Sequence, residues 1–104
     1  MTLKEFDANL KAAHPDVYET AAPKGKQRFA VWHRYGRSSV FGDDRNQVGA
    51  PKVQIDIVTN IHDDTLFDDI CAALWAMDIP YSVESEGYDD EYNAYRTILQ
   101  LVVI

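Results

Sequence analysis

The two most informative stretches of this chain are FAVWHRYG (residues 29–36) and VQIDIVT (residues 53–59). Each alternates well enough to predict a β-strand, and Val53, Ile55 and Ile57 give the second strand one apolar face. The first strand has apolar residues on both faces. We therefore expect a helix to cover one of its faces and a neighbouring subunit to cover the other.

A polar connection, Gly36 to Ala50, separates these two strands and contains neither cysteine nor histidine. Hairpin loops are usually about 2–5 residues long, and much longer connections are typically functional or disordered. This loop lacks the residue types on which nucleophilic and metal chemistry most often depend. We interpret it as an arm that contacts another protein.

Helical spacing of apolar residues predicts a helix near residues 3–13, where Thr2 can form a capping box with Glu5. Residues 17–26 are expected to be a connector. A second helix follows Asp63, the expected N-cap, and its apolar stripe comprises Leu66, Phe67, Ile70, Cys71, Leu74 and Met77.

Two further strands are predicted at residues 81–84 and 95–104, separated by a turn at residues 87–91. The last strand is apolar on both sides beyond Ile98, so we expect it to lie centrally or beneath a partner. The order is helix, strand, strand, helix, strand, strand. It predicts one α+β domain over residues 1–104, with an antiparallel or mixed four-stranded sheet and two helices packed on one face.

The net charge of −7 conceals opposite charges in the two halves of the chain. Residues 1–52 have nine Lys/Arg against six Asp/Glu, giving +3, whereas residues 53–104 have one against eleven, giving −10. The acidic half disfavours nonspecific binding of nucleic acid. If the fold separates the two signs, a heterologous contact between copies can close into a ring. The alternative is that both charges serve solubility.

Few residues suggest chemistry. His14, His33 and His62 have no second histidine or cysteine at metal-ligand spacing, so we predict no metal site and no cofactor. Cys71 lies within an apolar stripe, where a small buried side chain is expected. We expect no enzyme activity. We also expect no signal peptide, because the N-terminus is charged and has no apolar h-region. We expect no membrane span, because no apolar run approaches about 18 residues.

Aromatic and arginine residues near the first strand are interpreted as part of a protein interface, because Trp, Tyr and Arg are enriched at such surfaces. In this hypothesis the arginines meet acidic residues of a neighbouring copy. The candidate interface residues are Trp32, Arg34, Arg37, Phe41, Asp43, Asp44, Arg45, Val48, Asp89, Asp90 and Glu91.

The run VWHRYG (residues 31–36), followed by DDRN (43–46), VQIDIVT (53–59) and IPY (79–81), resembles small tailed-phage and prophage proteins of the tail terminator, or tail completion, family. The resemblance implies an α+β subunit that forms a ring, often a hexamer. Such a ring assembles in the bacterial cytoplasm, caps the head-proximal end of the tail tube and docks to the head connector. It implies neither cofactor nor enzyme activity.

Two other classes of function stay open. One is a small cytosolic regulator or inhibitor of phage origin that binds a host protein. The other is a single-strand nucleic-acid-binding module in which Trp32, Tyr35 and Phe41 stack on bases, although the acidic half of the chain opposes it.

Overall fold

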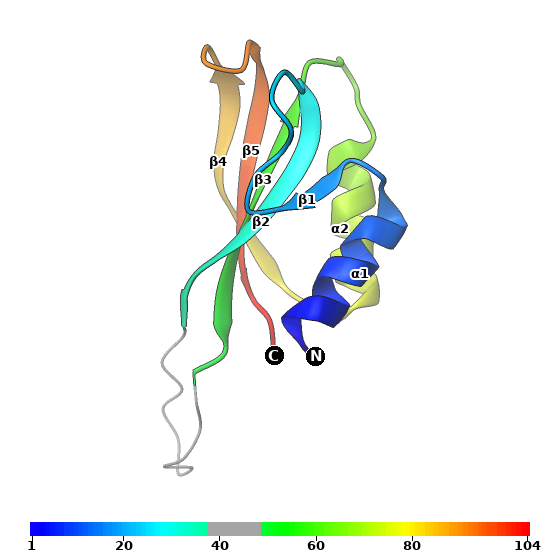
Figure 1. Cartoon of the computed structure of the whole chain (residues 1–104), viewed down its shortest axis with the longest axis vertical. Coiled ribbons are helices and arrows are strands. Elements are labelled where there is room, and N and C mark those ends of the chain that lie inside the picture. The colour runs from blue at the N-terminus through cyan, green and yellow to red at the C-terminus, as the bar shows by residue number, and fades with distance from the viewer. Residues whose placement is uncertain (38–48) are drawn as a thin grey trace.

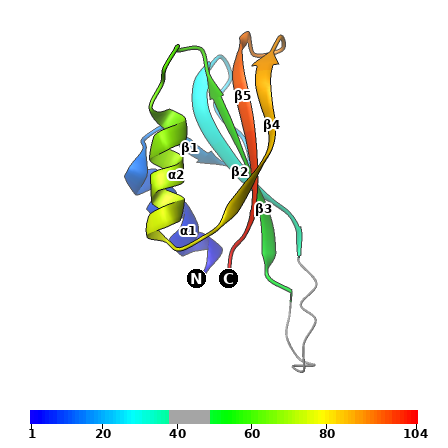
Figure 2. The same ribbon diagram turned by 180° about the vertical axis from the view of Figure 1, so that it is seen from behind.

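The computed structural model describes residues 1–37 and 49–104 of the chain. Its strands form one mixed sheet in the order β1-β2-β3-β5-β4, and both helices lie on the same face of this sheet (Figures 1 and 2). The predicted α+β class is confirmed. The elements are α1 (Leu3–Ala13), β1 (Val17–Glu19), β2 (Arg28–Arg37), β3 (Pro51–Thr59), α2 (Leu66–Ala76), β4 (Tyr81–Asp89) and β5 (Ala94–Val102).

The prediction of four strands missed β1, which lies in the segment expected to be a connector. Val17–Glu19 pairs in parallel with Ala30–Trp32 of β2. A strand of three residues is too short to show an alternation that predicts it. The sheet therefore has five strands and one parallel pair.

The main core lies between the sheet and the two helices. Strand β5 pairs antiparallel with β3 and with β4, so it is an interior strand, which fits the first of the two placements that its apolar sequence predicted. On β3, the predicted apolar face made by Val53, Ile55 and Ile57 is buried. The helices cover this face with side chains that are each fully buried, namely Phe6, Leu10, Leu66, Ile70 and Leu74.

The helix caps agree with the sequence in α1 but not in α2. The Thr2 side chain accepts a hydrogen bond from the Glu5 N–H, and the Glu5 carboxylate accepts one from the Thr2 N–H, each at 3.1 Å. The prediction of Asp63 as the cap of α2 was wrong. Thr65 stands at that position, and the Asp64 carboxylate accepts the Leu66 N–H at 3.2 Å. Asp63 itself lies in the preceding turn with a positive φ of 58°, and Arg28 of β2 holds Asp64.

The second face of β2 is partly covered by the same chain, where the sequence led us to expect a neighbouring subunit. Phe29 and Val31 are buried there together with Val58 and Ala94. Tyr18, Ala22 and Tyr92, which come from β1, the β1–β2 connection and the β4–β5 turn, pack against them. That turn is at residues 90–93, later than predicted, because β4 continues to Asp89.

Candidate interaction surfaces

Residues 38–48 of the expected arm lie outside the described residues, and they include five of the predicted interface residues. These five are Phe41, Asp43, Asp44, Arg45 and Val48. The other six lie on strand β2 and at the β4–β5 turn.

Trp32 is a core residue, which corrects its assignment to an interface. It is 3% exposed, and its ring packs edge-on against Phe6 of α1 with ring centres 5.4 Å apart. Its indole Nε1–H donates a hydrogen bond to Asp7 Oδ1 at 2.8 Å. The face of β2 that includes Trp32 is the one that α1 covers, so this side chain is not available to a second subunit.

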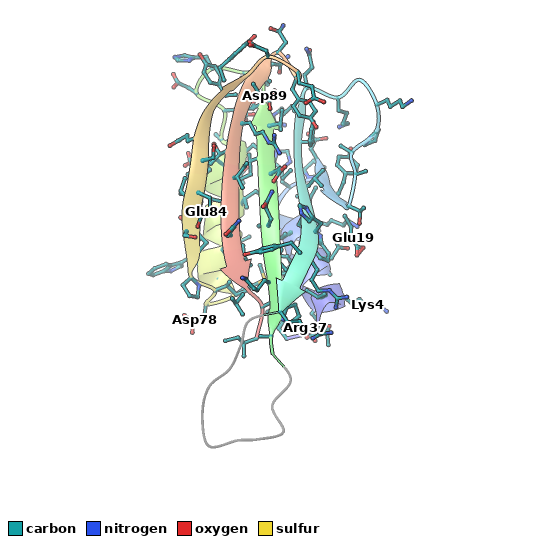
Figure 3. All side chains as sticks on the ribbon, turned by 90° about the vertical axis from the view of Figure 1, so that its left-hand side faces the viewer. Lys4, Glu19, Arg37, Asp78, Glu84 and Asp89 are labelled. Atoms are coloured by element: carbon teal, nitrogen blue, oxygen red, sulfur yellow. The ribbon has the colours of Figure 1, made fainter. Side chains whose placement is uncertain are left out.

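The predicted basic and acidic partners lie at opposite ends of the sheet. Figure 3 shows Arg37 at one end and Asp89 at the other. Asp89 already accepts a hydrogen bond from Arg96 at 3.2 Å and one from the Glu91 N–H at 2.9 Å. A contact between these arginines and the turn acids therefore needs two copies placed end to end.

A polar row crosses the face of the sheet that the helices leave uncovered. Arg96 donates to Asp56 at 2.5 Å, and Gln54 donates to the other oxygen of Asp56 at 2.8 Å. Gln100 then donates to Gln54 at 3.4 Å. The hydrogen bonds to Asp56 raise the pKa of the Arg96 guanidinium. Because these side chains bind one another, the row joins β3 to β5.

A second charged cluster joins β2 to the start of α2. The Arg28 guanidinium donates to Asp64 at 2.7 and 2.8 Å and to Asp16 at 3.1 Å. The Asp64 side chain is 5% exposed, and Arg28 holds the pKa of its carboxyl well below the usual range. The Thr59 hydroxyl, which also donates to Asp64, lowers this pKa further. The cluster stabilises the fold around the helix start.

A cleft of about 590 Å³ lies between the β1–β2 connection and the uncovered face of the sheet. Its lining includes Lys24, His33, Asp56 and Tyr92, and Asp56 is already bound by Arg96. Within residues 1–37 and 49–104, no group of three or more His, Cys, Asp or Glu side chains is arranged to hold a metal ion.

The helix side of β4 has an exposed apolar surface, here called the β4 surface. It consists of two groups, Trp75, Tyr81 and Val83 at the start of β4, and Tyr88 with Tyr95 near its end. Trp75 projects from α2 with 87% of its surface exposed, and Tyr81 and Val83 are 39% and 48% exposed. Trp75 and Tyr81 also line a groove at the end of α2. Clustered exposed apolar side chains of this kind typically mark a binding surface.

The two edges of the sheet differ in charge. Strand β4 is one edge, with Glu84 on the strand and Asp78 just before it (Figure 3). At the other edge β1 covers only Ala30–Trp32 of β2. The exposed Arg34 and Arg37 follow on β2, and Lys4 of α1 lies on the same side (Figure 3). Glu19 of β1 is the acidic exception on that side.

Sequence reasoning missed the β4 surface. Trp75 lies off the apolar stripe of α2, next to Leu74, and this offset was a usable signal for exposure. Tyr81 and Val83 alternate as a half-buried strand does, and only their place at the sheet edge shows that they are exposed.

Neither helix is long and apolar enough to cross a membrane, in the part of the chain that the structure describes. Comparisons of the chain with protein-family models, with curated proteins and with solved structures found no match.

Proposed function

We propose that this chain is a structural subunit that assembles with copies of itself into a ring, in the manner of a tail terminator or tail completion protein. In this role the ring, a hexamer in the expected form, is part of the virion at the head-proximal end of the tail tube. Its partners are the tube protein on one side and the head connector on the other.

The observation on which this proposal depends is the β4 surface. Its apolar side chains lie beside a sheet edge, so a partner that covers it gains both buried apolar area and backbone hydrogen bonds. Trp and Tyr are the residue types most enriched among the residues that dominate interface energy.

The opposite charges at the two edges favour a second copy as the partner. Glu84 and Asp78 at the β4 edge complement Arg34 and Arg37 at the β2 edge of another subunit. A contact between two different surfaces of the same subunit is heterologous, and repeating it about an axis gives a closed ring. A regulator that binds a host protein needs only one such edge, so the presence of two complementary edges favours self-assembly.

The described ends of β2 and β3, near Arg37 and Pro51, lie at the same end of the molecule as the N- and C-termini (Figure 1). In a ring whose axis runs along the strands, these ends lie at one rim. They are therefore placed to contact the tail tube or the connector.

Native mass spectrometry over a range of concentrations, with negative-stain electron microscopy, tests this proposal. We expect one closed ring of defined copy number, and we expect it to bind the ends of polymerised tail tube protein. A chain that stays monomeric at every concentration and with tube protein would contradict the proposal. A tight complex with a host protein in place of self-assembly would favour the regulator. Salt-dependent binding of single strands would favour the nucleic-acid module.

A further inference from the structure

We infer that neighbouring subunits join edge to edge. The free segment of β2, His33–Arg37, pairs antiparallel with the start of β4, Tyr81–Ser85, of the next copy. This inference rests on the proposed function, because it takes a second copy of the chain as the partner.

Both segments have an open backbone edge. Strand β4 is the last strand of the sheet, and β1 ends at Glu19, opposite Trp32 of β2. Among the described residues, no strand pairs with the outer side of His33–Arg37 or of β4. Unpaired N–H and C=O groups in a row are a template for another strand.

The strand directions fit this contact. Each of the pairs β2–β3, β3–β5 and β5–β4 is antiparallel, so β4 runs opposite to β2. Two copies placed side by side with the same end up therefore bring β2 and β4 together as antiparallel neighbours. This placement is the one that rotation about a ring axis along the strands produces.

The register within the sheet puts the two free segments at the same level. His33 lies opposite Gln54, Gln54 opposite Gln100, and Gln100 opposite Ser82. The next set of paired residues across the sheet likewise begins at Arg34 of β2 and ends at Tyr81 of β4. A neighbour related by rotation alone therefore meets β2 with the start of β4.

Charge and shape agree with this register. Arg37 of one copy lies level with Asp78 of the next (Figure 3), and exposed ion pairs of this kind set register more than affinity. Glu84 lies level with Glu19, and this like-charged pair disfavours pairing beyond the start of β4. The apolar contribution comes from Tyr81 on the helix side of β4. A groove beside the free segment, lined by Leu3, Glu19, Thr20, Trp32, His33 and Arg34, is positioned to receive it.

Irregular pairing limits the contact to a short stretch. The register shifts between Arg34 and Gly36 on β2 and between Val83 and Ser85 on β4. Bulges at sheet edges interrupt continuous pairing, which natural proteins use against open-ended aggregation.

Disulfide crosslinking tests the pairing. In a Cys71→Ser background, we mix His33→Cys and Ser82→Cys variants in equal amounts, oxidise them and separate the products without reductant. Both side chains lie on the uncovered face, so we expect a crosslinked pair of one of each variant. We expect the double variant to give a ladder of covalent oligomers up to the ring number. A matched control replaces Ser82→Cys with Ala72→Cys, an exposed position on α2.

Charge reversal gives an independent readout of the same contact. Arg34→Glu with Arg37→Glu should raise the dissociation constant of assembly about tenfold. Mixing this variant with one that has Asp78→Lys should restore mixed pairs. Lys24→Glu, an exposed change in the β1–β2 connection, should leave assembly unchanged.

The outcomes separate the two proposals. Edge pairing is wrong if native mass spectrometry shows rings but neither His33→Cys nor the shifted variant Tyr35→Cys forms a crosslink with Ser82→Cys. The ring proposal then still stands. A chain that never assembles overturns the ring proposal, and edge pairing is then wrong as well. Crosslinks together with charge rescue support both.

Discussion

Strands β3 and β4 have the same length of nine residues, and each directs apolar side chains toward the helix side of the sheet, yet the two strands differ in what covers them. On β3, Val53 and Ile55 are fully buried. On β4, Tyr81 and Val83 are 39% and 48% exposed. The difference is position, because β3 lies beneath the helices and β4 lies at the sheet edge. A similar pattern therefore builds the core in one strand and a surface in the other.

The largest expected effect is on the free energy of unfolding, which should differ between substitutions in β3 and in β4. Ile55→Ala removes a fully buried side chain from β3, and we expect the free energy of unfolding to fall by about 3 kcal/mol. Val83→Ala on β4 should change it by less than about 0.5 kcal/mol, as surface substitutions usually do. Urea denaturation measures both. Equal losses in the two variants would show that β4 is covered within the monomer.

The second-largest effect on the free energy of unfolding is expected where a buried ion pair is compared with an exposed one. Arg28→Met leaves the Asp64 carboxylate, 5% exposed, without its guanidinium partner, and we expect a loss of about 2 kcal/mol in the free energy of unfolding. The exposed pair of Lys11 and Asp7 is the control, because Lys11→Met should cost less than about 0.5 kcal/mol. A small loss in Arg28→Met would mean that water replaces the guanidinium at Asp64.

The same ion pair predicts a dependence on pH. The pKa of Asp64 is lower in the folded chain than in the unfolded chain, so its contribution is complete above the usual carboxyl pKa. That contribution is lost as the pH falls from there toward the folded-state pKa, because the unfolded chain then binds more protons. Asp64→Asn should therefore lose less stability than the native chain between neutral and acid pH, measured by urea midpoints. Parallel pH profiles would contradict this assignment.

The smallest effect on monomer stability is expected at the β4 surface, where the effect on assembly is large. Tyr81→Ser with Val83→Ser should leave the free energy of unfolding within about 0.5 kcal/mol and weaken assembly by at least about tenfold. Unfolding at low concentration and analytical ultracentrifugation measure the two quantities separately. Assembly as strong as that of the native chain would exclude β4 as the interface.

Part of this fold could be predicted because the periodicity of apolar residues is a local signal. The alternation of Val53, Ile55 and Ile57 and the capping box of Thr2 and Glu5 both follow from short sequence patterns. Trp32 shows where such patterns fail. Its aromatic character fits a core or an interface equally well, and only its packing against Phe6 and its hydrogen bond to Asp7 decide between them.

Of the candidate surfaces, the sequence predicted only that the two halves of the chain have opposite net charges. The sequence separates positive and negative residues into two halves, but it does not say which of them share an edge. Asp89 is acidic in sequence and is bound by Arg96 in the structure, whereas Glu84 projects from the open edge. Which acids are available to a partner therefore depends on contacts between distant segments.

Local spacing sets which side chains share a face, so the amino-acid sequence was enough to predict the α+β class, the two helices and the apolar face of β3. Contacts between distant segments were needed to show that β1 joins the sheet, that β5 is an interior strand, that Trp32 is buried and that β4 is an edge. Those properties follow from strand order. Strand order depends on the packing of residues far apart in the chain, which a periodic pattern does not encode.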